Sequence, residues 1–165
     1  MIAALFVSSL MAVATVAIHM VGLVFLMEIM RKRSPKLRPH TSSLRQMVFI
    51  LLVVLGLFLI HAVEIWAYAG VYMMLGAFES FEAALYFSTS TFTTLGYGDV
   101  IMDSQWRLVG AIEGFNGFLL IGWSTAFLVS VIGVCALRKP IGSTILARMI
   151  KPVASRRLML MPKPR

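Results

Sequence analysis

The chain has 165 residues, of which 59% are hydrophobic and 13% are charged, and its mean hydropathy is +0.89. Because these values lie far from those of a soluble domain of this length, the composition excludes that class and places the chain in a bilayer. The formal net charge of +8 does not indicate nucleic-acid binding, because fourteen of the fifteen Lys and Arg residues fall in two acid-free segments, 31–45 and 138–165.

The first element is an apolar stretch at 2–27. Two more stretches, 47–70 and 108–137, also reach the roughly 20 residues that a membrane-spanning helix needs. We therefore expect three crossings. By the positive-inside rule both basic segments are cytoplasmic, which puts the N-terminus outside and the C-terminus in the cytoplasm. Four of the seven acidic residues lie in 72–107, which this topology also places outside. The sequence thus predicts a multi-pass protein of the plasma (cell inner) membrane.

The first stretch has an alternative interpretation as a cleaved signal peptide, with residues 12–14 (Ala-Val-Ala) as the cleavage site. Signal peptides carry positive charge before an apolar region of about 7 to 15 residues. Here residues 1–4 carry no charged side chain and the apolar region continues past His19. We therefore favour a retained helix at 1–30.

A shorter helix is predicted after the basic connector at 31–45 and the second spanning helix at 46–72. Ser80 is a plausible N-cap, and acidic residues flank it near the positive end of the helix dipole. Residues 83–94 would make roughly 18 Å of helix at most, which is too short to cross a bilayer. We therefore expect a re-entrant helix at 80–93, so that the chain enters and leaves the membrane on one side.

The segment 91–99 has the sequence Thr-Phe-Thr-Thr-Leu-Gly-Tyr-Gly-Asp. Placed after a short helix and between two spanning helices, it resembles the pore of potassium channels, in particular the bacterial type with two spanning helices and one pore loop, here with one extra N-terminal helix. The alternative, an ordinary extracellular turn, does not account for this run of residues. The resemblance implies an all-α membrane protein of three transmembrane helices, a re-entrant pore helix and a selectivity filter, assembled as a homotetramer.

The resemblance also implies the role of each filter residue. Potassium ions would bind to the backbone carbonyls of Thr94, Leu95, Gly96 and Tyr97 and to the Thr94 hydroxyl, with Gly98 closing the filter. Carbonyls that all point inward require alternating left- and right-handed backbone, which glycine adopts without a Cβ penalty. No cofactor is implied, since K⁺ is the transported ion.

The last spanning helix, predicted at 106–137, extends the resemblance. Gly117 and Gly122 fall where a hinge would lie, and close helix packing is an equal alternative for both. The family alignment and an i, i+3/i+4 stripe predict four residues that face a central cavity. These are Phe118, Ile121, Thr125 and Val129.

Several residues are predicted to support the filter. Many simple bacterial channels carry a glutamate at the position of Ser90, so Asp99 needs another partner, for which we expect Tyr86. Thr93 lies at the end of the pore helix. Glu113 is predicted to lie near filter level and to accept hydrogen bonds from that helix, in place of the missing brace.

Glu64 and His61 lie three residues apart on one helical face. We expect Glu64 near the outer interface, where solvation is cheap, and His61 as a neutral hydrogen-bonded residue rather than a ligand. No cluster of metal ligands is evident in the sequence.

The C-terminal segment 138–165 is predicted to be a cytoplasmic basic tail. Alternating basic and apolar residues suggest contact with anionic lipid, and a disordered topology anchor is the alternative. Two rival functions are a potassium uptake transporter, disfavoured by length, and a non-conducting or regulatory subunit that retains the pore fold. An enzyme is not expected, because the sequence has no evident nucleophile and base pair.

Overall fold

The computed structural model describes residues 1–33 and 43–137. The predicted basic tail and most of the predicted basic connector lie outside the described residues. Contacts divide the chain into two units, Met1–Val129 and Ser130–Arg165. In the second unit, the described residues 130–137 are helical.

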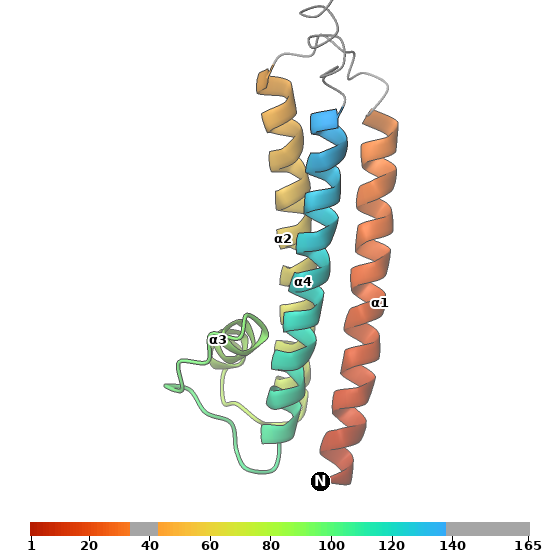
Figure 1. Cartoon of the computed structure of the whole chain (residues 1–165). Helices are drawn as coiled ribbons and strands as arrows, with labels where there is room; N and C mark the ends of the chain where they lie inside the picture. Colours follow the sequence, from red (N-terminus) through yellow and green to blue (C-terminus); the bar gives the residue numbers. More distant parts are fainter. Residues whose placement is uncertain (34–42, 138–165) are drawn as a thin grey trace, which may run out of the picture. The chain divides into compact units, whose positions relative to one another are not determined.

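The described residues form an all-α protein with four helices (Figure 1). Their bounds are Ile2–Arg33 for α1, Ser43–Met74 for α2, Phe81–Phe92 for α3 and Arg107–Leu137 for α4. Within the described part of the chain, α1, α2 and α4 are long and apolar enough to cross a membrane. The prediction of three candidate spans and a short fourth helix is confirmed.

The short helix α3 has a defined start and end. Ser80 has extended backbone (φ −134°, ψ 149°), and its side chain accepts a hydrogen bond from the backbone N–H of Ala83. Glu82 lies in the first turn, near the positive end of the helix dipole. After 12 residues the helix ends, and the chain continues without helix from Leu95 to Ile101. This helix is therefore too short to span, as the sequence predicts.

The three long helices, α1, α2 and α4, contact one another through small residues and a few polar side chains. A Cβ built on Gly22 would lie 2.7 Å from Ile60, and one built on Gly56 would lie 2.9 Å from Leu26. Each glycine therefore lets α1 and α2 approach closely. Between α1 and α4, Asn116 Nδ2 donates to Thr15 Oγ1 at 2.7 Å.

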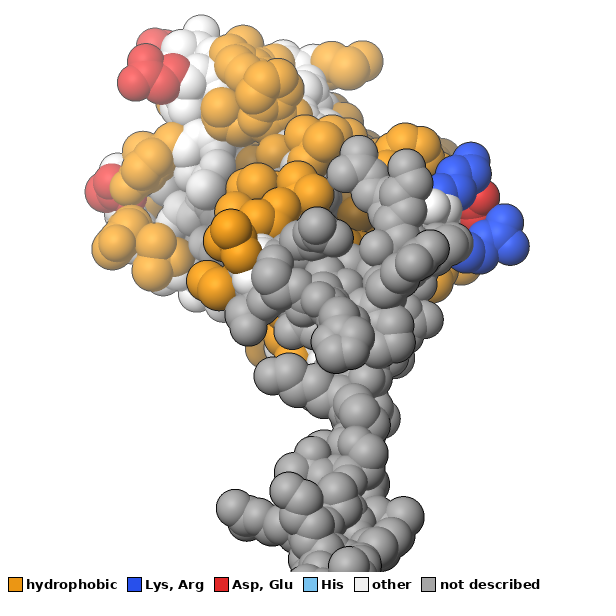
Figure 2. Space-filling view, turned by 90° about the horizontal axis from the view of Figure 1, so that it is seen from above, with side chains coloured by type: hydrophobic (Ala, Val, Ile, Leu, Met, Phe, Trp, Pro, Cys, Tyr) orange, Lys and Arg blue, Asp and Glu red, His pale blue; other side chains and the backbone are white. Residues whose placement is uncertain are grey.

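Large apolar side chains remain exposed along all of the long helices. Hydrophobic side chains form much of the described surface in Figure 2, and charged side chains lie at its margins. This surface is suited to lipid or to further protein, since an aqueous surface rarely exposes so much apolar area.

Candidate functional site

The segment after α3 has an alternating backbone. Thr94, Gly96 and Gly98 have φ values of 61°, 56° and 78°, whereas the intervening residues do not have positive φ. Left-handed backbone costs an L-residue about 1–2 kcal/mol, so only Thr94 adopts it at a steric cost here. Alternation of this kind turns successive carbonyls toward the same side of the segment, as a ring of ion-binding carbonyls requires.

Ser90 anchors this segment. Its carbonyl accepts hydrogen bonds from the backbone N–H groups of Leu95 (2.9 Å) and Gly96 (3.1 Å). Its hydroxyl accepts from the N–H of Tyr97 at 3.4 Å. Sequence reasoning treated Ser90 only as the site of a missing glutamate. A serine in the last turn of a helix gave no signal of these three bonds, because the fold of the following loop creates them.

Asp99 holds the C-terminal end of the segment. The Tyr86 hydroxyl donates to Asp99 Oδ2 at 2.7 Å, so the predicted contact is present. This hydrogen bond lowers the pKa of the Asp99 carboxyl below its ordinary value of 3.8, since it favours the ionised form. The same bond raises the pKa of Tyr86.

The residues from Thr93 to Asp99 are all exposed in the single chain, with 56% of Leu95 and 69% of Tyr97 accessible. Non-helical backbone at membrane depth is tolerated only where protein buries it or where it lines water. One chain therefore does not supply the surroundings that this segment needs in a bilayer.

Glu113 lies on α4 and is fully buried. Its Oε1 is 2.5 Å from Ser88 Oγ of α3, and its Oε2 accepts a hydrogen bond from the Tyr72 hydroxyl of α2. Ser88 Oγ is also 3.1 Å from the Ile65 carbonyl. The expected contact between Glu113 and the short helix is thus present, and Tyr72 is a partner that the sequence did not predict. One carboxylate joins α2, α3 and α4.

Comparison with protein families gives one match, to a model described as an ion channel, over residues 48–133. The matched region covers just over half of the chain and includes the part of α2 from residue 48 on, α3, the filter-like segment and most of α4. The chain belongs to the ion channel family. No curated protein and no solved structure matches it.

Membership of this family establishes the general class of function. The protein is a multi-pass membrane protein of the ion channel family and not an enzyme. The helix α1 lies outside the matched region, so the family does not account for it.

Two glycines of α4, Gly117 and Gly122, differ in the space around them. A Cβ built on Gly117 would lie 2.2 Å from the Phe92 carbonyl oxygen, so this glycine admits the end of α3. Close packing therefore explains Gly117 without a hinge. Gly122 has open space around it in the single chain, which leaves both of its predicted roles as hypotheses.

The residues predicted to line a channel cavity are all at least partly accessible. Their side chains are exposed or half-buried in the single chain, and the half-buried Ile121 packs against the buried core. They are Phe118, Ile121, Thr125 and Val129. The Thr125 hydroxyl donates to the Ile121 carbonyl at 2.9 Å, which satisfies it within the helix. Their placement around a cavity remains a prediction.

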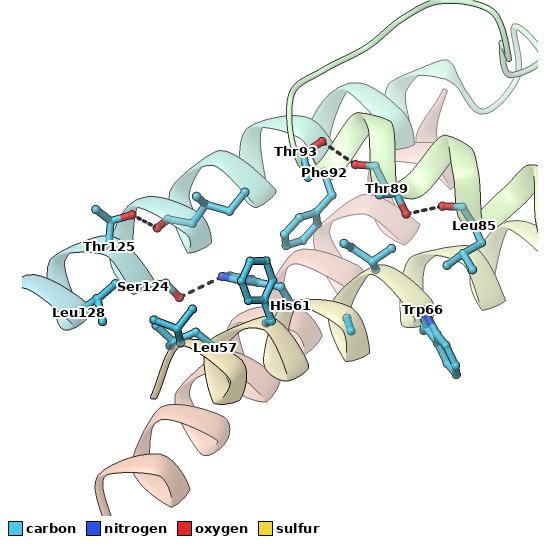
Figure 3. A pocket seen from close by; sticks show the side chains of 15 residues that line it. Leu57, His61, Trp66, Leu85, Thr89, Phe92, Thr93, Ser124, Thr125 and Leu128 are labelled. Carbon is cyan, nitrogen blue, oxygen red and sulfur yellow. Dashed lines mark hydrogen bonds between the residues drawn. The ribbon is translucent and has the colours of Figure 1, made fainter. Parts of the chain in front are cut away.

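The expectation for Glu64 is wrong. Its side chain is fully buried rather than near a solvated interface. Its two oxygens lie 2.9 Å from His19 Nδ1 and 2.8 Å from His61 Nδ1. His61 is hydrogen-bonded, as expected, and its Nε2 also contacts Ser124 Oγ at 3.0 Å (Figure 3). Sequence reasoning missed His19 because it lies on a different helix, where spacing carries no information about its partner.

Proposed function

We propose that this chain is one subunit of a homotetrameric potassium channel, with residues 94–98 as its selectivity filter. The observation that supports this most is the alternating left-handed backbone at Thr94, Gly96 and Gly98. A dehydrated potassium ion needs a shell of oxygens, and rings of backbone carbonyls from several chains can supply it. We assign the coordinating atoms to the carbonyls of residues 94–97 and to the Thr94 hydroxyl.

The exposed filter supports assembly from more than one chain, and the resemblance to potassium channels implies four copies. Each chain contributes one pore segment, and that segment is exposed in the single chain. Four copies around one axis would bury its outer side against neighbouring chains and leave its carbonyls facing the ion path. The negative ends of four α3 helices would then favour a cation at the inner end of the filter.

The proposed orientation follows from charge. The basic segments 31–45 and 138–165 would lie in the cytoplasm, and the N-terminus and the filter mouth outside. The proposed contact of the basic tail with anionic lipid is part of this topology.

The experiment is ion flux into liposomes that contain the purified chain. We expect fast, passive, barium-blocked flux that is selective for K⁺ over Na⁺. Tyr97→Asp would place a carboxylate among the outer carbonyl rings and rehydrate that end, so Na⁺ should then permeate. If the wild-type protein carries no flux, it is a non-conducting subunit. If the Tyr97→Asp tetramer stays strictly K⁺-selective, the filter assignment is wrong.

A further inference from the structure

A buried cluster of His19, His61 and Glu64 is not used by the proposed filter. One ring nitrogen from each histidine and one carboxylate oxygen lie within 4.8 Å of one another. His19 comes from α1 and the other two from α2, so the cluster joins a helix outside the family match to one inside it. His19 and Glu64 are fully buried, and the His61 side chain is 16% exposed.

We propose that these three side chains bind a divalent transition-metal ion of the zinc class. Two imidazoles and one glutamate are a recurring ligand set for zinc, which leaves one coordination position open. Bonds of roughly 2.0–2.2 Å in a tetrahedral site place ligand atoms about 3.3 Å apart. The present contacts, 2.9 Å to Oε1 and 2.8 Å to Oε2 of Glu64, would therefore open, and both histidine rings would turn toward the ion.

Ser124 supports this geometry. Its Oγ lies 3.0 Å from His61 Nε2 and 3.5 Å from His19 Nε2, the ring nitrogens that do not face Glu64. A histidine that binds metal through Nδ1 carries its proton on Nε2 and usually donates it to an oxygen. One hydroxyl oxygen has two lone pairs and can accept both protons. Ser124 would thus orient both rings at once.

The surroundings of the cluster are aromatic. The His19 ring centroid is 5.5 Å from Trp123, and that of His61 is 5.7 Å from Phe92 at the end of α3. Such a shell limits water around a metal and strengthens its bonds to the protein. The contact with Phe92 would also place the ion next to the C-terminal end of α3, which precedes the proposed filter.

A path to the cluster is present in the structure. His61 and Ser124 line a pocket of about 570 Å³ whose wall also includes Thr93 and Thr125 (Figure 3). Under the proposed function, Thr93 supports the filter and Thr125 borders the inner cavity. The access route rests on the proposed function: an ion in the water of the inner cavity would reach His61 through this pocket.

The test uses the purified full-length chain, stripped with a chelator, incubated with Zn²⁺ and desalted before its zinc content is measured. We expect about one zinc ion per chain, and a loss of affinity of at least about tenfold in His19→Asn, His61→Asn and Glu64→Gln. His40→Asn and Glu28→Gln are the controls. His40 is the one histidine of the chain outside the cluster, and Glu28 is a partly exposed carboxylate that pairs with Arg31. Both controls should bind zinc like the wild type.

A second variant separates ligation from folding. His61→Cys keeps a ligand but makes it a soft thiolate, so binding should persist and its preference should shift from Zn²⁺ toward Cd²⁺. A purely structural histidine would show no such exchange. The proposal is overturned if the wild type binds no more zinc than the Glu64→Gln variant, or if its stability depends on the cluster without any zinc uptake.

Potassium flux is measured on the same preparations. Zinc binding without potassium selectivity would overturn the proposed function and leave the metal site. Potassium selectivity without zinc binding would overturn the metal site alone.

Discussion

The proposed filter segment and the buried polar clusters differ in whether a single chain supplies their interaction partners. Glu113 and Glu64 are fully buried, and each carboxylate has two hydrogen-bond partners within the chain. Across the described residues, no buried side-chain nitrogen or oxygen lacks a partner. Residues 94–98, by contrast, are exposed and have left-handed backbone at every second position. A single chain therefore supplies hydrogen-bond partners to its own buried carboxyl groups but leaves exposed the segment that we propose other copies complete.

The largest expected effect is that of Gly96→Ala. In the single chain a Cβ at Gly96 meets no atom within 4 Å, so its cost comes from the positive φ alone, about 1–2 kcal/mol in each copy. We expect loss of potassium flux in liposomes. Gly70→Ala is the matched control, since it also has open space but lies inside α2 without positive φ. Equal flux in both variants would show that potassium conduction does not depend on left-handed backbone at Gly96.

Gly117→Ala should have the next largest effect. Its Cβ would meet the Phe92 backbone oxygen at 2.2 Å, so α3 would have to move. We expect lower thermal stability of the assembly and weaker K⁺/Na⁺ selectivity, measured by gel mobility after heating and by flux. Gly122→Ala, which meets nothing within 4 Å in the single chain, should change selectivity less. A gating change in Gly122→Ala with normal behaviour in Gly117→Ala would favour the hinge interpretation instead.

Glu113→Ala should destabilise the protein by about 1–3 kcal/mol, because it removes the acceptor of the buried Tyr72 hydroxyl and leaves Ser88 with the Ile65 carbonyl alone. Glu113→Gln keeps an acceptor oxygen and should lose less. Thermal unfolding in detergent and open probability in bilayers measure the difference. If both variants match the wild type, Glu113 does not support the filter.

The smallest effect concerns the exposed bond between Tyr86 and Asp99. Because this bond lowers the pKa of Asp99, its contribution is present above the ordinary value of 3.8 and is lost as the pH falls through the lowered value. Flux should therefore be insensitive to outer pH between 7 and 5, a range set by that direction of shift. In Tyr86→Phe, any acid-induced loss of flux should begin at a higher pH than in the wild type. A wild-type loss centred above pH 5 would implicate another group.

The features of the fold that depend on local sequence pattern could be predicted from the sequence. The three long apolar helices, the Ser80 cap and the short α3 follow from helix length and capping. The contacts of Asp99 with Tyr86 and of Glu113 with α3 were also predicted, because the family resemblance fixes their relative depth.

Contacts between helices that are distant in sequence could not be predicted in the same way. His19 meets Glu64 across 45 residues, and Asn116 meets Thr15 across 101. Hydrophobic periodicity fixes which face of a helix is buried, but the rotation of α1 against α2 and α4 decides which polar atoms meet. The burial of Glu64 was missed for this reason.

The central claim is that several chains complete one filter, and mixed channels test it most directly. Wild-type and Tyr97→Asp chains are co-expressed in equal amounts, and single channels are recorded with K⁺ and Na⁺ on opposite sides. If four chains share one filter at random, only about one channel in sixteen should contain four wild-type copies and be strictly K⁺-selective. If about half of the channels are strictly selective, each chain forms its own filter and the account is contradicted.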